Sequence, residues 1–321
     1  MQCPLGLEDF ILGAHPESSE SVMTPALVAT LLLALGGSDG SPATEDDLEG
    51  AYADSHGVRI HYVEQGDGPL VILIHGFPDY WYTWRHQMPA LAEHFRVVAI
   101  DQRGYNRSDK PEGVDAYKME HLVNDVEAVI DEFGEDRATV VGHDWGGMVA
   151  WNFAMHKPDR IDRLVILNLP HPKCLARELA TNPAQQRNSQ YARNFQKEGV
   201  EKAMRPEMLV GWVQDEDARK KYTAAMKRSS MAAMLAYYKA NYPREPYTDD
   251  VDFPPVKCRV LQFHGLKDQY LLHGALNDTW KYVEKDLTLL TIPDAGHFVQ
   301  HEATDFVTTN MVRWLLDGDE R

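Results

Sequence analysis

An aspartate stands between glycines at the end of an apolar run, in the segment 140–147 (VVGHDWGG). The spacing G-x-D-x-G, followed by a helix-forming stretch, predicts a tight strand-turn-helix that presents the side chain of Asp144 at the edge of a sheet. Small residues flank such a turn because larger side chains would clash in it. A carboxylate held there can act as a nucleophile, although an aspartate near a helix N-terminus can also be an ordinary cap.

A second glycine-containing loop, residues 75–78 (HGFP), follows another apolar run. A loop at this place supplies one backbone N–H of an oxyanion hole, and the residue after the nucleophile supplies the other. We therefore predict Phe77 and Trp145 as the two donors, each worth about 3–4 kcal/mol to an oxyanion. We also expect His75 and Trp81, from this loop and the aromatic cluster after it, to line a substrate pocket. The competing interpretation is an ordinary tight turn rich in Gly and Pro.

An acid and a base follow two later apolar runs, in the chain order nucleophile, acid, base. Asp268 comes after the run 259–263, and His297 comes after the run 287–292 in the small-residue turn 294–298 (DAGHF). An imidazole can be a general base near neutral pH, and a carboxylate on its other nitrogen fixes its tautomer. If Asp268 is not that carboxylate, the remaining candidates are Asp294 and the residues near Asn168.

The apolar runs predict the strands that must position these side chains. Residues 70–74, 96–100, 138–141, 163–167, 259–263 and 287–292 are continuous or nearly continuous, which is typical of strands buried on both faces of a parallel sheet. Residues 58–63 (VRIHYV) alternate, as in a half-buried antiparallel strand. Helical segments between the runs indicate an α/β chain with a doubly wound sheet.

A block of helix-forming sequence interrupts this alternation. Residues 171–255 contain no strand-like run, and segments such as 216–227 and 230–241 favour helices. We expect this block to be a cap over the carboxyl edge of the sheet, where ligands of open α/β sheets bind. The core that carries the sheet would then consist of residues 51–170 and 256–321.

Residues 1–50 form a separate N-terminal extension. Its apolar run 26–35 (ALVATLLLAL) is shorter than the ~20 residues that span a bilayer, so no membrane span is expected. The segment 23–43 resembles a signal peptide with a small-residue cleavage site, but the residues before the run are acidic rather than basic. Export and a disordered or surface extension both remain open, with a cytoplasmic location slightly favoured.

Composition excludes several classes of partner. The 321 residues carry a formal net charge of −17, which argues against nucleic acids or anionic membranes as partners. The cysteines, Cys3, Cys174 and Cys258, are far apart and odd in number, so they predict neither a disulfide framework nor a metal site. The chain has no phosphate loop or dinucleotide fingerprint, and we expect no cofactor. The oligomeric state stays open.

Together these features resemble the epoxide hydrolases of the α/β-hydrolase fold. The resemblance rests on H-G-x-P, the H-D-W-G-G elbow, the helical block and the late Asp268 and His297, and it covers residues 52–314. It implies an α/β-hydrolase fold with a mostly parallel, doubly wound sheet and a helical cap after the sixth strand. It also implies that Asp144 opens a small-molecule epoxide to an alkyl-enzyme ester, which water activated by His297 hydrolyses to a vicinal diol.

The family carries two cap tyrosines that protonate the epoxide oxygen. The segment 190–196 (QYARNFQ) resembles the one that holds the first, Tyr191, and 235–239 (LAYYK) the one that holds the second. In the predicted helix from residue 230, Tyr238 lies on an apolar stripe of helical spacing, and Tyr237 lies to one side of it. We therefore predict Tyr191 and Tyr238 as the acids, with core tyrosines under the cap as the competing interpretation.

Two other functions remain to be weighed. Haloalkane dehalogenases share the aspartate elbow, but an Asn commonly fills the x of H-G-x-P, where this chain has Phe77. Fluoroacetate dehalogenases place an Arg after the nucleophile, where this chain has Trp145. Both departures, and the aromatic residues around the site, favour an uncharged, apolar epoxide. A non-catalytic hydrolase-fold receptor is the alternative of a different class. Such receptors usually lack one catalytic residue, whereas this chain retains all of them.

Overall fold

Eight segments pair into one sheet in the part of the chain that the computed structural model describes, residue 48 and residues 50–318. The strands are β1 (Gly50–Ser55), β2 (Val58–Gln65), β3 (Leu70–Ile74), β4 (Arg96–Ile100), β5 (Ala138–His143), β6 (Ile161–Leu167), β7 (Arg259–Gly265) and β8 (Leu287–Ile292). Their order is β1-β2-β4-β3-β5-β6-β7-β8. Strands β3 to β8 run parallel to one another, and β2 pairs antiparallel with both of its neighbours, β1 and β4.

The sheet is the predicted one, with two differences at its start. Strand β1 has the sequence GAYADS and pairs along its length with β2 at the edge of the sheet. Because β1 contains few apolar residues, the sequence has no apolar run that would predict a strand there. Strand β2 is buried over four consecutive residues rather than on one face. Its polar His61 tolerates burial because its Nδ1 lies 2.7 Å from Oδ2 of Asp101.

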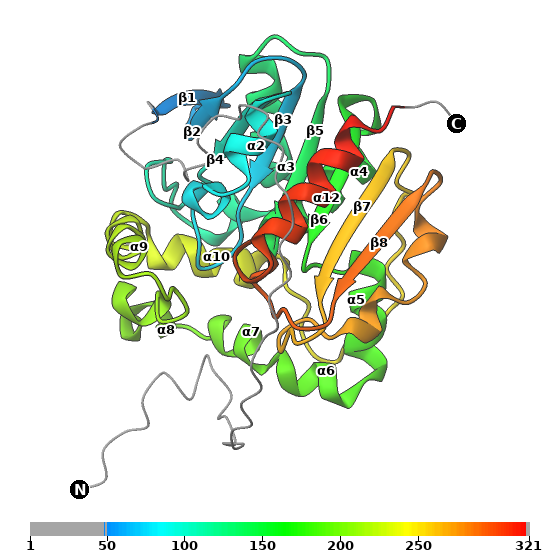
Figure 1. Ribbon diagram of the computed structural model, residues 1–321. Helices are drawn as coiled ribbons and strands as arrows, with labels where there is room; N and C mark the ends of the chain where they lie inside the picture. The colour runs from blue at the N-terminus through cyan, green and yellow to red at the C-terminus, as the bar shows by residue number, and fades with distance from the viewer. Residues whose placement is uncertain (1–47, 49, 319–321) are drawn as a thin grey trace, which may run out of the picture. The chain divides into compact units, whose positions relative to one another are not determined.

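Helices cover both faces of the sheet. They are α2 (Met88–Ala92), α3 (Met119–Glu132), α4 (Trp145–His156), α5 (Pro172–Thr181), α6 (Pro183–Asn188), α7 (Gln190–Phe195), α8 (Val200–Ala203), α9 (Glu216–Arg228), α10 (Met231–Asn241), α11 (Val299–Glu302) and α12 (Thr304–Leu316). Helices α3 and α4 pack together, α2 contacts α12, and the two pairs lie on opposite faces of the sheet (Figure 1).

The helices α5 to α10 form the inserted block, and they follow the sixth strand, as predicted. In Figure 1 they lie at the end of the sheet toward which the parallel strands point. The side chain of Asp215 caps α9 and that of Ser230 caps α10 at their N-termini. Side chains also cap α5 and α6, whereas α7 and α8 have no side-chain cap, so four of these six helices begin at a side-chain hydrogen bond.

The signal-like segment 23–43 and nearly all of the extension 1–50 lie outside the described residues. Within the described residues, no helix is long and apolar enough to cross a membrane.

Candidate active site

Asp144 occupies a strained turn between β5 and α4. Its backbone φ of 51° and ψ of −120° lie in a region that residues with a side chain rarely adopt. The flanking glycines permit the turn, because a Cβ on Gly142 would come within 2.2 Å of the Gly146 carbonyl oxygen. A Cβ on Gly146 would in turn come within 2.1 Å of the carbonyl oxygen of Ile74. The structure therefore has the elbow that the G-x-D-x-G spacing predicts.

The loop after β3 contacts the carboxylate of Asp144 directly. The backbone N–H of Phe77 donates a hydrogen bond of 2.8 Å to Oδ1 of Asp144. A Cβ on Gly76 would stand 2.4 Å from the Cβ of Asp144, so only glycine allows the loop to come so near. Trp145 is the first residue of α4, where backbone N–H groups have no partner within the helix. Of the two predicted donors, the Phe77 N–H therefore contacts the carboxylate of Asp144, and the Trp145 N–H lies at the start of the helix that follows it.

The late histidine and aspartate complete a chain of contacts with Asp144. Nε2 of His297 lies 3.5 Å from Oδ2 of Asp144, and its Nδ1 lies 2.9 Å from Oδ2 of Asp268. All three side chains are buried. Backbone N–H groups of Tyr270 and Leu271 donate to Oδ1 of Asp268, at 2.8 and 3.0 Å. The imidazole therefore bridges two carboxylates, one of them held by its own loop.

The remaining candidates for the acid do not reach the imidazole. Asp294 pairs with Lys267 at 2.9 Å, and its side chain is 94% exposed. Asn168 follows β6 with a positive φ of 42°, and its Nδ2 donates 2.7 Å to Oδ2 of Asp268. Asn168 is thus a partner of Asp268 rather than a substitute for it, a role that the sequence did not assign.

The three charged groups shift one another's pKa values. Burial favours the neutral form of Asp144, but the hydrogen bond and charge of His297 hold its pKa below the usual range. Against burial, the charge of His297 lowers the pKa of Asp268 to about 2. Burial lowers the pKa of His297, but the charge of Asp268 and hydrogen bonds to both carboxylates raise it to about 10. At neutral pH the resting site holds two carboxylates and an imidazolium.

The cap brings two tyrosines over this site. Tyr191 on α7 and Tyr238 on α10 pack edge to face, with ring centroids 6.0 Å apart. The ring of Tyr238 also meets Phe77 at 5.6 Å and Trp145 at 5.0 Å. Burial raises the pKa of both phenols well above the usual value, and the charge of Asp144 adds to the shift. Both hydroxyls are therefore protonated at neutral pH.

We expected Tyr237 to lie to one side of the apolar stripe of its helix, but the structure shows that Tyr237 is itself buried. The helix α10 is buried all round from Ala233 to Tyr238, and Tyr237 is fully buried. Its hydroxyl donates 2.8 Å to the carbonyl oxygen of Arg103 in the core. An apolar stripe on a predicted helix implies that the opposite face is exposed to solvent. The helix α10 instead packs against both the cap and the core, so more than one of its faces is buried. Tyr237 is directed to Arg103, and Tyr238 packs against the oxyanion loop.

The two residues expected to line the pocket, His75 and Trp81, are both buried. His75 is fully buried, with Nδ1 2.7 Å from the Gly76 carbonyl oxygen and Nε2 accepting 3.0 Å from the Gln102 N–H. Neither ring nitrogen is available to a substrate, which differs from the expectation. The ring of Trp81 is likewise buried and packs against Tyr80 and Tyr82. These side chains brace the loop that carries Phe77.

A histidine that the sequence did not single out holds the catalytic segment. Nε2 of His143 lies 2.9 Å from the carbonyl oxygen of His297, and Gln300 Nε2 lies 3.2 Å from its Nδ1. Burial lowers the pKa of His143 to about 3, so the ring is neutral and donates through Nε2. His143, the residue before Asp144, thus fixes the backbone of His297.

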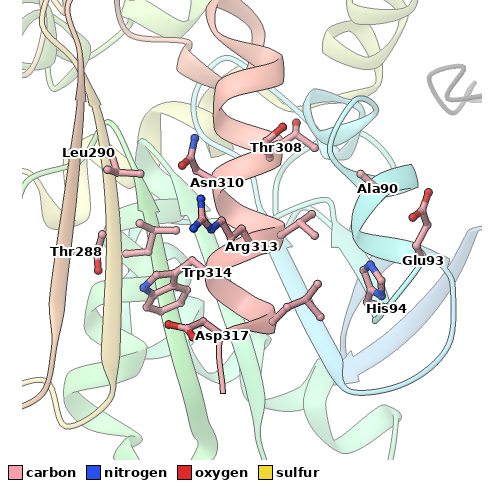
Figure 2. A pocket seen from close by; sticks show the side chains of 14 residues that line it. Ala90, Glu93, His94, Thr288, Leu290, Thr308, Asn310, Arg313, Trp314 and Asp317 are labelled. Carbon is pink, nitrogen blue, oxygen red and sulfur yellow. The ribbon is translucent and has the colours of Figure 1, made fainter. Parts of the chain in front are cut away.

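Other features of the surface do not contribute to this chemistry. Figure 2 shows a groove beside α12, lined from α2, β8 and α12 by side chains such as Thr288, Asn310 and Trp314. No sequence-predicted site residue lies in it. Within the described ranges, no group of three or more His, Cys, Asp or Glu side chains could hold a metal ion. Cys174 and Cys258 are buried thiols.

Comparisons with known proteins agree with this geometry. The family described as the α/β hydrolase fold matches residues 69–304. Epoxide hydrolase 1 of Caenorhabditis elegans is 33% identical over 299 residues, which cover 85% of this chain and 72% of that protein. YfhM of Bacillus subtilis, an AB hydrolase superfamily protein, is 30% identical over 290 residues, covering 84% of this chain and 99% of that protein.

A solved structure is similar over nearly the same span. It is a mutant epoxide hydrolase from Bacillus megaterium in complex with its product, (R)-3-[1]naphthyloxy-propane-1,2-diol. The TM-score is 0.78 at 32% identity, and the match covers 83% of this chain and 99% of that chain.

Proposed function

Since the chain belongs to the epoxide hydrolase family of the α/β-hydrolase fold and acts on epoxides, we propose that it does so through a covalent ester on Asp144. The observation that carries this proposal is the carboxylate at the elbow. It accepts the Phe77 N–H at 2.8 Å and lies 3.5 Å from the imidazole of His297. A carboxylate at this position can be the attacking atom and later the carbonyl of the ester.

In the first step, an oxygen of Asp144 attacks an epoxide carbon and the carbon–oxygen bond of the ring breaks. The departing alkoxide is nearly as basic as hydroxide, whose parent water has a pKa of ~15.7, so it needs a proton. Tyr191 and Tyr238 are the proposed donors, because both are protonated, the charge of Asp144 acts on both phenols, and their rings pack against each other. The products of this step are an alkyl-enzyme ester and a new hydroxyl group.

Formation of the ester changes the base. The charge of Asp144 and its hydrogen bond help to raise the pKa of His297 in the resting site. Esterification removes that charge, so the pKa of His297 falls, and its proton can replace the one that the tyrosines gave up. The neutral imidazole then takes a proton from water, whose oxygen attacks the ester carbonyl. Collapse of the tetrahedral intermediate releases the diol and restores the carboxylate of Asp144 beside an imidazolium.

The proposed substrate is an uncharged, apolar epoxide, with aromatic groups favoured. Aromatic rings of Phe77, Trp145, Phe195 and Tyr238 pack together above the nucleophile. The charged side chains of the site are already paired within it. The product bound by the Bacillus megaterium enzyme is the diol of a naphthyl ether, which supports an aryl glycidyl ether as the first substrate to test.

Isotope labelling tests the covalent step. In a single turnover in ¹⁸O-water, with enzyme in excess over an aryl glycidyl ether, label is expected in the carboxylate of Asp144, and the diol stays unlabelled. Peptide mass spectrometry locates the label, and Asp268 is an internal control because its carboxylate takes no part in bond formation. Label in the diol on the first turnover means direct attack by water and overturns the proposal.

A further inference from the structure

The cap holds its two tyrosine-bearing helices together through one amide side chain. Gln196 follows the last residue of α7, and its Nε2 donates to the carbonyl oxygens of Tyr238 at 3.0 Å and Tyr242 at 2.8 Å. The carbonyl of Tyr238 also accepts the Tyr242 N–H at 3.2 Å, so the amide of Gln196 adds a second hydrogen bond to it at the end of α10. Gln196 therefore joins the end of α7 to the end of α10.

This link lies close to the rings of both proposed acids. Phe195, the neighbour of Gln196, packs edge to face against Tyr191 at 5.7 Å and against Tyr238 at 5.1 Å. Tyr191 and Tyr238 come from different helices, so their mutual position depends on how α7 sits against α10. The amide of Gln196 fixes that relation through the backbone of Tyr238 itself.

A second glutamine joins the cap to the loop of the acid. Gln185 on α6 is fully buried. Its Oε1 accepts the Leu272 N–H at 2.9 Å, and its Nε2 donates 2.7 Å to the carbonyl oxygen of Tyr270. The neighbouring N–H groups of this same turn hold the carboxylate of Asp268. Gln185 therefore fixes the turn that orients Asp268 toward His297.

We propose that these two amides are positioning residues for different half-reactions. Gln196 positions the tyrosines for ring opening, and Gln185 positions Asp268 for hydrolysis of the ester. The inference rests on the proposed covalent mechanism, in which tyrosines act only in the first step and the imidazole acts as a base only in the second. A misplacement of about 1 Å in a catalytic group can cost about 10²-fold in rate. A Gln196 variant should therefore slow formation of the ester, and a Gln185 variant should slow its hydrolysis.

The first test is Gln196→Met, which keeps the shape of the side chain and removes the donor. Gln196 is partly exposed, so the variant is expected to fold. Rapid-quench mass spectrometry in single turnovers measures formation and decay of the ester separately. Formation should slow by about tenfold or more, while decay stays at the wild-type rate. Gln190→Met is the matched control, because Gln190 bonds only Arg193 and Asn194 on its own helix, and both rates should stay unchanged.

The second test reverses the pattern at Gln185. Gln185→Met should slow decay of the ester and leave its formation near the wild-type rate. Since the site is buried, Gln185→Glu is the second variant: it keeps an acceptor for Leu272 and removes the donor to Tyr270. A structural role alone would lower the melting temperature without separating the two rates.

The results separate failure of the positioning roles from failure of the covalent mechanism on which they rest. Opposite effects of the Gln196 and Gln185 variants support the assignment. Variants that slow both steps equally, or neither, overturn it while the ester still forms. If no ester forms on the wild type or on His297→Gln, in which its decay should be blocked, the covalent mechanism is overturned, and this inference with it.

Discussion

Nε2 of His297 lies 3.5 Å from Oδ2 of Asp144, so the two groups form an ion pair with a long hydrogen bond. In the proposed mechanism, this imidazolium stabilises the charge of Asp144 before ring opening. Once the ester has formed and His297 is neutral, the same nitrogen would take a proton from water. The protonation state of His297 would therefore decide which of the two steps it serves.

We expect His297→Gln to stop the reaction at the ester. Glutamine cannot take a proton from water, so hydrolysis should fall by about 10²–10⁴-fold. Ring opening does not need the imidazole as a base and should continue. Intact-mass measurement should show enzyme plus substrate after one turnover. In Asp144→Ala no adduct should form. Normal turnover by His297→Gln would place the base elsewhere in the chain.

The two steps should differ in their dependence on pH. Ring opening needs ionised Asp144, whose pKa lies below its usual range, so this rate should stay flat down to about pH 4. Hydrolysis needs neutral His297, and it should rise with pH through the pKa that His297 has in the ester. That pKa should lie below the value of about 10 in the resting site, because the charge of Asp144 is gone. Stopped-flow measurement of both phases checks this, and a shared acidic limb would contradict it.

The buried strands and the turn at Asp144 were predictable from sequence, because each is determined by residues close together in the chain. Strands buried on both faces must be continuous apolar runs, and the elbow admits only glycine two residues before and two residues after Asp144. These constraints act within a few residues, so spacing reveals them. Strand β1 was not predicted, because an edge strand can be polar, and the sequence of β1, GAYADS, is largely polar.

Contacts between distant segments were not predictable in the same way. Asn168 donates to Asp268, which is 100 residues further along the chain, and Gln185 binds Leu272 at a separation of 87. Amide side chains occur on any polar surface, so neither residue differs from its neighbours in sequence. The same limit explains Tyr237: periodicity shows which residues of a helix share a face, but not how many faces are covered.

Asp79→Asn should change how stability depends on pH. Asp79 is fully buried after the oxyanion loop, and burial raises its pKa to about 7, which the hydrogen bonds from Thr83 and the Tyr80 N–H offset only in part. Between about pH 4 and 7 the folded protein then holds a proton that the unfolded chain has lost. Its stability falls as pH rises through this window, by about 3–4 kcal/mol.

Urea unfolding at pH 4.5 and pH 7.5 measures this effect. The asparagine variant does not titrate at this position, so its stability relative to wild type should increase between the two pH values. Asp294→Asn is the control, because that side chain is 94% exposed, and its effect should be the same at both. A constant difference for Asp79→Asn would mean that the carboxyl keeps its charge in the fold.

Substitution of the tyrosines tests the acid assignment most directly. Two phenols that share one oxygen can partly replace each other, so Tyr191→Phe and Tyr238→Phe should each lose part of the ring-opening rate. The double variant should lose about 10²–10⁴-fold, while hydrolysis of a preformed ester continues. Phenylalanine keeps the edge-to-face contact between the two rings, 6.0 Å apart in the wild type, so the fold should survive.

Tyr237→Phe separates chemistry from packing, because it removes a neighbouring hydroxyl that points elsewhere. The carbonyl of Arg103 loses its donor at 2.8 Å, which should cost about 1–3 kcal/mol of stability. Ring opening should stay close to the wild-type rate, since this hydroxyl points into the core rather than toward Asp144. Pre-steady-state rates of ester formation for all four variants, with melting temperatures beside them, decide the matter. A rate loss at Tyr237 in place of Tyr238 would show that the second acid is the wrong tyrosine, and wild-type rates in the double variant would remove both phenols from the mechanism.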